Sequence, residues 1–514
     1  MSELQCSHEF QMLPNECVYK IFRFLKPKEL MLCYQVDSNL NKLCKLESLW
    51  KNQVDKVAKM IFDTETNYDT CKAYHAARNR HNDSIVLMDK LDLDMEVDEF
   101  LDIEQLELDA EKFEKIPPEI KHLDNLVALK IGFDIKQVSL ELIQLPNLQI
   151  LDMSLCKIQQ TPSNIRLLTG LVALWLSNNK LQNISSEICQ LTNLQSLDLQ
   201  YNEIKEISHK IGHLINLKKL LLNYNQIQCI PIELWKLTNL NKLDISNNQL
   251  HGIPAEVTKL INLHKLSLDN MKIREISPEL LGLTNLQKLT FERNKITKIP
   301  SNIIKLRKLG ELNLQQNKLK IFPTEIIQLT NLFCLNLSRN KINTIPTEIW
   351  KLSNLSSLNL NRNKLKNIPI EIKHLTKLTY LNLYHNKLKK IPVGIGKLTN
   401  LSQVHFSKNN IIKIPFEIGK LINLETLDLE SNKIRYIPST ISNLTSLTRL
   451  NIYNNPISKI PQEINKLAKI DTIYIDVGNK KKFPPDMKGE IIENLYVGCT
   501  DSDFTGSAYA SDSD

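Results

Sequence analysis

Residues 332–352 read Leu332-Phe-Cys-Leu335-Asn-Leu337-Ser-Arg-Asn340-Lys-Ile342-Asn-Thr-Ile345-Pro346-Thr-Glu348-Ile349-Trp-Lys-Leu352. The same order returns every 23 residues over most of the 514-residue chain. Its first leucine recurs at positions 171, 194, 217, 240, 263, 286, 309, 355, 378, 401, 424 and 447, and Ile470 continues the series. Upstream, Leu148, Leu126 and Ile103 extend it. A fixed period of this length indicates a repeat architecture, here of seventeen units between about 103 and 490.

Each part of the unit predicts a local structure. Leu335 and Leu337 alternate with polar neighbours, as a strand with one buried face requires. Asn340 follows the strand, where an amide can bond backbone groups that a bend leaves unpaired. Pro346 and Glu348 fit the first turn of a short helix. One unit cannot bury its apolar stripe alone, so the units are expected to stack into a parallel sheet, with an arc of roughly 80 Å at ~4.8 Å per strand.

This pattern, L-x-x-L-x-L-x-x-N-x-L/I with a following I-P-x-E-I-x-x-L, resembles the leucine-rich repeat of the 23-residue type found in intracellular Ras-group proteins. The resemblance implies an α/β fold, a leucine-rich-repeat solenoid with a curved parallel β-sheet and short convex helices. The asparagine is missing at Glu111, Asp134, Cys156, Met271 and Gly478. Four of these positions lie near the ends, where atypical units are expected. Met271 is internal and indicates either a local kink or a tolerated substitution.

Residues 8–50 belong to no repeat. Pro14 and Glu16 fit a helix start, and Val18, Ile21, Phe22 and Leu25 then share one helical face. Two further short helices are expected before Trp50. About forty residues cannot easily bury this much apolar surface alone, which favours a partner surface. The alternative is a small helical cap that seals the first repeats.

The order Leu13-Pro14-x-Glu16, Ile21-Phe22-x-x-Leu25, Leu30, Val36 and Leu49-Trp50 resembles the F-box, a small all-α module. The resemblance implies binding to the Skp-type adaptor of a cullin complex. Adaptor contacts are then expected from Leu13, Pro14, Ile21, Leu25 and Trp50. The predicted organisation is an F-box at 8–55, a helical linker at 56–88, an N-terminal cap with the first repeat at 89–125, repeats with a C-terminal cap at 126–490, and a disordered acidic tail at 491–514.

Charge is divided along the chain. The net formal charge of +8 is the sum of an acidic segment and a basic repeat body. The acidic segment, 89–111, contains eleven acidic residues and a single basic one, Lys90. No run of 18 apolar residues and no secretory signal are found, so neither membrane insertion nor secretion is expected. The ten cysteines form no CxxC pair and no zinc spacing, which predicts free thiols and no metal or cofactor. A cytoplasmic location is expected, with the nucleus as another possibility.

The strand-side residues predict a protein-binding surface. The residue before each ladder asparagine gives a basic stripe of Arg293, Gln316, Arg339, Arg362, His385 and Lys408, with Tyr384 and Tyr380 beside it. Nearer the N-terminus lies an aromatic group of Trp175, Tyr201 and Tyr224. Arginine and aromatic residues anchor protein interfaces, so a target with an acidic or phosphorylated segment is expected here. Acids on the same face argue against nucleic acid. His385 and His405 are interpreted as exposed interface residues, because no nucleophile or acid pair accompanies them.

Two functions are open at this point. The first is a non-catalytic substrate-recognition subunit of a Skp–cullin–F-box ubiquitin ligase, which holds a target protein on its concave face. The second is a signalling scaffold similar to Ras-group repeat proteins, with no role in ubiquitin ligation. An enzyme in its own right would need a catalytic cysteine domain, and the segment after the repeats offers only Cys499.

Overall fold

The structure, a computed structural model, describes residues 80, 82–109, 112–113, 115–132, 140–250, 252–485 and 489–494. The chain divides into two compact units, Met1–Phe100 and Leu101–Asp514. In the described part of the first unit, residues 82–91 are helical and a second helix, α7 (Val97–Leu101), begins. The predicted F-box at 8–55 lies outside the described residues.

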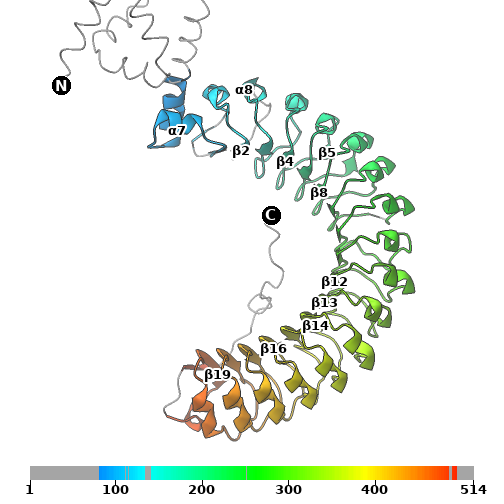
Figure 1. Ribbon diagram of the computed structural model, residues 1–514, viewed down its shortest axis with the longest axis vertical. Coiled ribbons are helices and arrows are strands. Elements are labelled where there is room, and N and C mark those ends of the chain that lie inside the picture. The colour runs from blue at the N-terminus through cyan, green and yellow to red at the C-terminus, as the bar shows by residue number, and fades with distance from the viewer. Residues whose placement is uncertain are drawn as a thin grey trace, which may run out of the picture. The chain divides into compact units, whose positions relative to one another are not determined.

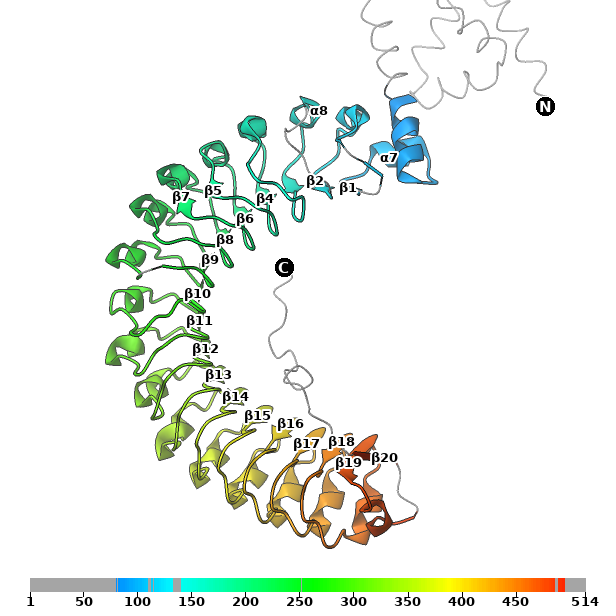
Figure 2. The same cartoon turned by 180° about the vertical axis from the view of Figure 1, so that it is seen from behind.

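The described part of the second unit contains one parallel sheet of 18 strands. Figures 1 and 2 show its strands along a concave face and its helices along the opposite, convex side. The strands are β1 (Gln105–Leu108), β2 (Ala128–Ile131), β3 (Ile150–Asp152), β4 (Ala173–Trp175), β6 (Ser196–Asp198), β8 (Lys219–Leu221), β9 (Lys242–Asp244), β10 (Lys265–Ser267), β11 (Lys288–Thr290), β12 (Glu311–Asn313), β13 (Cys334–Asn336), β14 (Ser357–Asn359), β15 (Tyr380–Asn382), β16 (Gln403–His405), β17 (Thr426–Asp428), β18 (Arg449–Asn451), β19 (Thr472–Asp476) and β20 (Glu490–Asn494). A separate pair joins β5 (Asn183–Ile184) to β7 (Glu206–Ile207).

The convex side carries one short helix in nearly every unit. These are η2 (Pro118–His122), α8 (Leu140–Ile143), η3 (Ser163–Leu167), η4 (Ile188–Gln190), η5 (His209–His213), η6 (Ile232–Lys236), η7 (Ala255–Lys259), η8 (Leu280–Gly282), η9 (Ser301–Lys305), η10 (Thr324–Gln328), η11 (Thr347–Lys351), η12 (Ile370–His374), η13 (Val393–Lys397), η14 (Phe416–Lys420), η15 (Ser439–Asn443), η16 (Gln462–Lys466) and η17 (Lys480–Lys482). All but α8 are 3₁₀ helices. Pro346 is the N-cap of η11 with ψ 152°, not its first helical residue as expected, because the chain is still extended there.

The register confirms the repeat. Leu335 in β13 pairs with Leu358 in β14, 23 residues later, and equivalent pairs follow along the sheet. Leu335, Leu337, Ile349 and Leu352 are fully buried between the strands and the convex helices. Each unit therefore buries the leucines of its strand and the apolar residues of its helix in one continuous core, as the solenoid prediction requires.

The ladder asparagines form the hydrogen bonds that the sequence predicts. The Asn340 amide Nδ2 donates to the carbonyl oxygens of Leu314 (2.9 Å), Leu337 (3.1 Å) and Ser338 (3.1 Å). Its Oδ1 accepts the backbone N–H of Leu319 at 3.0 Å. One side chain thus ties two consecutive units together and satisfies buried backbone groups at the end of the strand.

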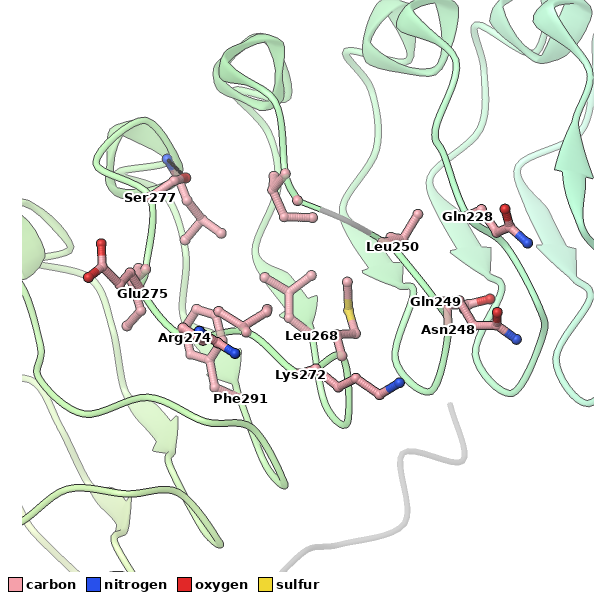
Figure 3. A pocket seen from close by; sticks show the side chains of 16 residues that line it. Gln228, Asn248, Gln249, Leu250, Leu268, Lys272, Arg274, Glu275, Ser277 and Phe291 are labelled. Carbon is pink, nitrogen blue, oxygen red and sulfur yellow. Dashed lines mark hydrogen bonds between the residues drawn. The ribbon is translucent and has the colours of Figure 1, made fainter.

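The loop at Met271 differs from those of its neighbours in one backbone hydrogen bond, although β9, β10 and β11 keep the 23-residue register. In the neighbouring units Gln249 and Lys295 donate their backbone N–H to Ile227 and Ile273 of the preceding unit. Among the described residues, Lys272 makes no such bond and has a positive φ of 58°. A pocket of about 690 Å³ opens beside it, with Leu250, Leu268 and Phe291 in its lining (Figure 3).

One expected boundary also changes. Residues 491–494, placed in the acidic tail, belong to β20, which pairs in parallel with β19. The sequence missed this strand because it follows β19 by 18 residues (Thr472 pairs with Glu490) and not by 23. Within the described residues, no helix is both long and apolar enough to cross a bilayer.

Candidate functional site

The predicted basic stripe lies on adjacent units of the concave side, at one unusual backbone conformation. Each member has a left-handed φ between 48° and 54°: Arg293, Gln316, Arg339, Arg362, His385 and Lys408. This conformation costs non-glycine residues of order 1–3 kcal/mol, least for asparagine. Asparagine occupies the same position at Asn178, Asn247, Asn270 and Asn454. The backbone therefore does not explain the cationic side chains in between.

Tyr384 is the centre of the stripe's most organised part. The Arg362 guanidinium lies 5.4 Å from the centroid of its ring, and the Lys408 Nζ lies 5.3 Å from it. The His385 ring is 5.8 Å away. Interaction with the Tyr384 hydroxyl is the main reason that the pKa of Lys408 is raised. Since each cation–π contact contributes about 0.5–2 kcal/mol, the two contacts favour this arrangement of the three side chains.

A polar layer lies beneath the stripe. The Gln315 Oε1 accepts from the Asn336 Nδ2 (2.9 Å) and the Ser338 hydroxyl (3.0 Å), while its Nε2 donates to Glu292 at 3.1 Å. Glu292 also lies 3.4 Å from the Nε of Arg293. These hydrogen bonds fix the side chains of Gln315, Asn336 and Ser338, and the contact with Glu292 orients Arg293 at the edge of the layer.

The two histidines differ in environment. His385 is exposed, but His405 is 3% exposed, with its Nδ1 3.9 Å from the Asp428 carboxylate and its ring 5.7 Å from that of Tyr380. The interpretation of both as exposed interface residues is therefore wrong for His405. It occupies the strand column between two buried residues, where neighbouring strands cover the side chain.

The aromatic group is only partly assembled. The Tyr201 and Tyr224 rings stack with centroids 4.2 Å apart and an interplanar angle of 9°. Both occupy the same left-handed position as the basic stripe. Trp175 projects from β4 in a different column and is 37% exposed. The stacked pair is thus one flat apolar surface, and Trp175 is a separate contact point.

Sequence reasoning missed a lysine column on the same face. Lys219, Lys242, Lys265 and Lys288 open the successive strands β8–β11. The Lys288 Nζ lies 3.2 Å from the Glu311 carboxylate. The signal was available, since these lysines recur every 23 residues just before a buried leucine. Together with nearby aspartates they make the middle of the face a mixture of both charges.

The aspartates of this region resist ionisation. Burial raises the pKa of Asp198 and of Asp244, and it raises that of Asp269 to about 7, with Glu292 as a further contribution. Asp269 accepts the Thr290 hydroxyl at 2.9 Å and the Glu292 backbone N–H. In the part of the chain that the structure describes, no group of three or more metal-ligating side chains is found.

Asp269→Asn is expected to stabilise the protein above pH 7. The raised pKa means that the folded state holds the proton more tightly than the unfolded state, so stability falls as pH rises from about 4 through about 7. Asparagine has no such penalty: its Oδ1 can accept the Glu292 N–H, and its Nδ2 can donate to the Thr290 hydroxyl oxygen once that hydroxyl turns. Urea unfolding of both proteins at several pH values measures the effect, and the difference should vanish below about pH 4. An equal offset at every pH would contradict the assignment.

The adaptor-binding residues proposed from sequence, Leu13, Pro14, Ile21, Leu25 and Trp50, lie outside the described residues. The family comparison bears on this segment independently. The F-box-like family matches residues 10–56. Leucine-rich-repeat families match residues 169–227, 192–250, 261–319, 324–409 and 422–481.

Solved structures support the repeat assignment. A leucine-rich-repeat protein of Leptospira interrogans is 34% identical, with a TM-score of 0.62, and the match covers 76% of this chain and 96% of that protein. An internalin of Listeria monocytogenes is 26% identical with a TM-score of 0.54, over 60% of this chain and 88% of its own. The plant peptide hormone receptor RGFR1, solved in complex with RGF2, is 29% identical with a TM-score of 0.54, over 73% and 65%.

No curated protein matches the chain. The asparagine ladder, the 23-residue register and these structural relatives agree on the repeat body, while the family match accounts for the segment before it. The chain therefore belongs to the leucine-rich-repeat proteins and, with its F-box-like segment, is an F-box leucine-rich-repeat protein.

Proposed function

We propose that this protein is a substrate-recognition subunit of a Skp–cullin–F-box ubiquitin ligase. The observation that carries the proposal is the F-box-like segment at 10–56 in one chain with a long repeat sheet. The segment at 8–55 binds the Skp-type adaptor, and the concave face binds the target protein. The chain forms no covalent bond itself. It accelerates ubiquitin transfer by holding a target lysine near the charged conjugating enzyme.

The basic stripe supplies the target contacts. Arg339 and Arg362 present planar, charged donors that suit carboxylate or phosphate groups. Arginine and tyrosine are also the residues that most often dominate binding energy at protein interfaces. Arg339 and Arg362 are held in a left-handed backbone conformation that costs free energy, and Tyr384 lies between Arg362 and Lys408. Both observations support recognition of an acidic or phosphorylated segment.

The proposed location is the cytoplasm or the nucleus, where ubiquitin ligation takes place. The four cysteines with a described environment, Cys156, Cys189, Cys229 and Cys334, are free thiols, in keeping with a reducing compartment. Burial raises the pKa of Cys189 to about 12, so this thiol is poorly suited to nucleophilic chemistry.

A second function, a signalling scaffold without an adaptor, is favoured by one observation. The repeats have the 23-residue length of the Ras-group type, not the longer cysteine-bearing form common in F-box leucine-rich-repeat proteins. In that case the N-terminal helices serve only as a cap for the first repeats, and the concave face still binds a protein.

The double variant Leu13→Ala/Pro14→Ala is expected to lose adaptor binding. Two apolar side chains removed from a docking surface cost about 3–5 kcal/mol, which lowers affinity by at least a hundredfold. Calorimetric titration of the full chain with purified Skp-type adaptor measures this, with Arg339→Glu as a control that binds normally. If the unchanged protein does not bind adaptor, the scaffold function replaces the ligase function.

A further inference from the structure

Five large apolar side chains lie exposed outside the concave face, on four consecutive units. They follow the ladder asparagines, in the loops and first turns that lead to the convex helices. This lateral patch consists of Ile370, Val393, Ile412, Phe416 and Tyr436, which are 46%, 52%, 57%, 59% and 63% exposed. Neighbouring exposed apolar residues on successive units mark an interaction surface more often than scattered ones do.

Three members of the patch share a position that is polar in most other units. Ile370, Val393 and Phe416 are the first residues of η12, η13 and η14. The equivalent positions of other helices are polar: Ser301, Thr324, Thr347, Ser439 and Gln462. Two exceptions outside the patch are Ile232, the first residue of η6, which is 56% exposed, and the smaller Ala255, the first residue of η7. The repeat itself therefore does not require an apolar residue here.

A basic pocket adjoins the patch. Its volume is about 870 Å³, and its lining includes Ile412, Phe416 and Tyr436. Lys413, Arg435 and Lys459 also line it, against the single acid Glu463. The Lys413 Nζ lies 5.6 Å from the centroid of the Phe416 ring. A ligand that fits must combine an apolar or aromatic anchor with negative charge.

We propose that the chain's own segment 501–514 binds this lateral patch. That segment, which lies outside the described residues, carries Phe504 and Tyr509 among the acids Asp501, Asp503, Asp512 and Asp514. An aromatic ring enters the pocket, and the aspartates pair with its cations. The concave basic stripe is a poorer match because it offers no exposed aliphatic side chains.

The connection is short enough. β17 to β20 are parallel neighbours, so β20 ends at the same edge of the sheet from which the loops of the patch begin. Three strand spacings separate β20 from β17, about 14 Å. The ten residues from 495 to Phe504 can span up to about 33 Å, which leaves length for the further step from the strand ends to the helix starts. The inference does not depend on the proposed ligase function.

Photo-crosslinking of the full chain tests this contact. Phe504 is replaced by p-benzoylphenylalanine, and the monomeric product is mapped by mass spectrometry after irradiation. Cross-links to 412–416 or 435–439 are expected. They should fall about tenfold or more in Ile412→Glu/Phe416→Glu, which removes two apolar anchors and adds repulsion. Ile232→Glu, the same change at an equivalent exposed position, should leave the yield within about twofold.

Three outcomes overturn the proposal. They are cross-links confined to the basic stripe, cross-links only between molecules, and the absence of any product in the folded monomer. Because all three substituted positions are exposed, circular dichroism should show unchanged folding for each variant.

Discussion

Asn340→Ala is expected to lower the free energy of unfolding by about 2–4 kcal/mol. The change deletes the acceptor of the Leu319 N–H and three donations to carbonyl oxygens. The carbonyls keep other partners: Leu337 accepts from Asn363 and Ser338 accepts from Gln316. Among the described residues the buried Leu319 N–H has no other partner, so it accounts for most of the loss.

The matched control is an exposed asparagine at the end of the preceding unit. Asn331 is exposed and donates one hydrogen bond, to the Arg307 carbonyl at 2.7 Å. Asn331→Ala should cost less than about 0.5 kcal/mol. Urea unfolding gives the overall loss, and amide exchange around Leu319 shows whether the opening is local, as expected for stacked units. Equal losses in the two variants would show that the ladder bonds are not the cause.

Much of the fold could be predicted because its physics is local and periodic. Leu335 and Leu337 identify a strand with one buried face, and Asn340 identifies the bend after it. Repetition every 23 residues then fixes the register, since each strand pairs with the equivalent strand of the next unit. The basic stripe could be found in the same way, because residues 23 apart in the sequence lie side by side on successive units of the solenoid.

The other features of the site depend on contacts between strands, which the residues at one repeat position do not reveal. The burial of His405 depends on Asp428 and Tyr380 from adjacent strands. The stacking of Tyr201 on Tyr224, without Trp175, follows from a left-handed backbone that the sequence did not predict. β20 escaped detection because its spacing leaves the period. The lateral patch was missed because only Ile370, Val393 and Phe416 share a column, while Ile412 and Tyr436 belong to two others.

Changing Arg293, Arg339 and Arg362 together to Glu is expected to reduce target capture by about a hundredfold or more. Each arginine of an interface can contribute about 1–2 kcal/mol, and the reversed charge repels an acidic segment. Proteins that co-purify with the unchanged chain from its native cells are quantified against the variant. Adaptor binding should be the same for both, because the substitutions lie in the repeat sheet.

The control for this triple variant reverses the same number of charges on the convex side. Lys305, Lys397 and Lys420 are exposed and end η9, η13 and η14. Their change to Glu alters the net charge equally but leaves the concave face intact. If capture depended only on the overall basic charge of the repeat body, both triple variants would lose it together. Loss confined to Arg293, Arg339 and Arg362 would assign recognition to the basic stripe, and undiminished capture would remove the stripe from the target site.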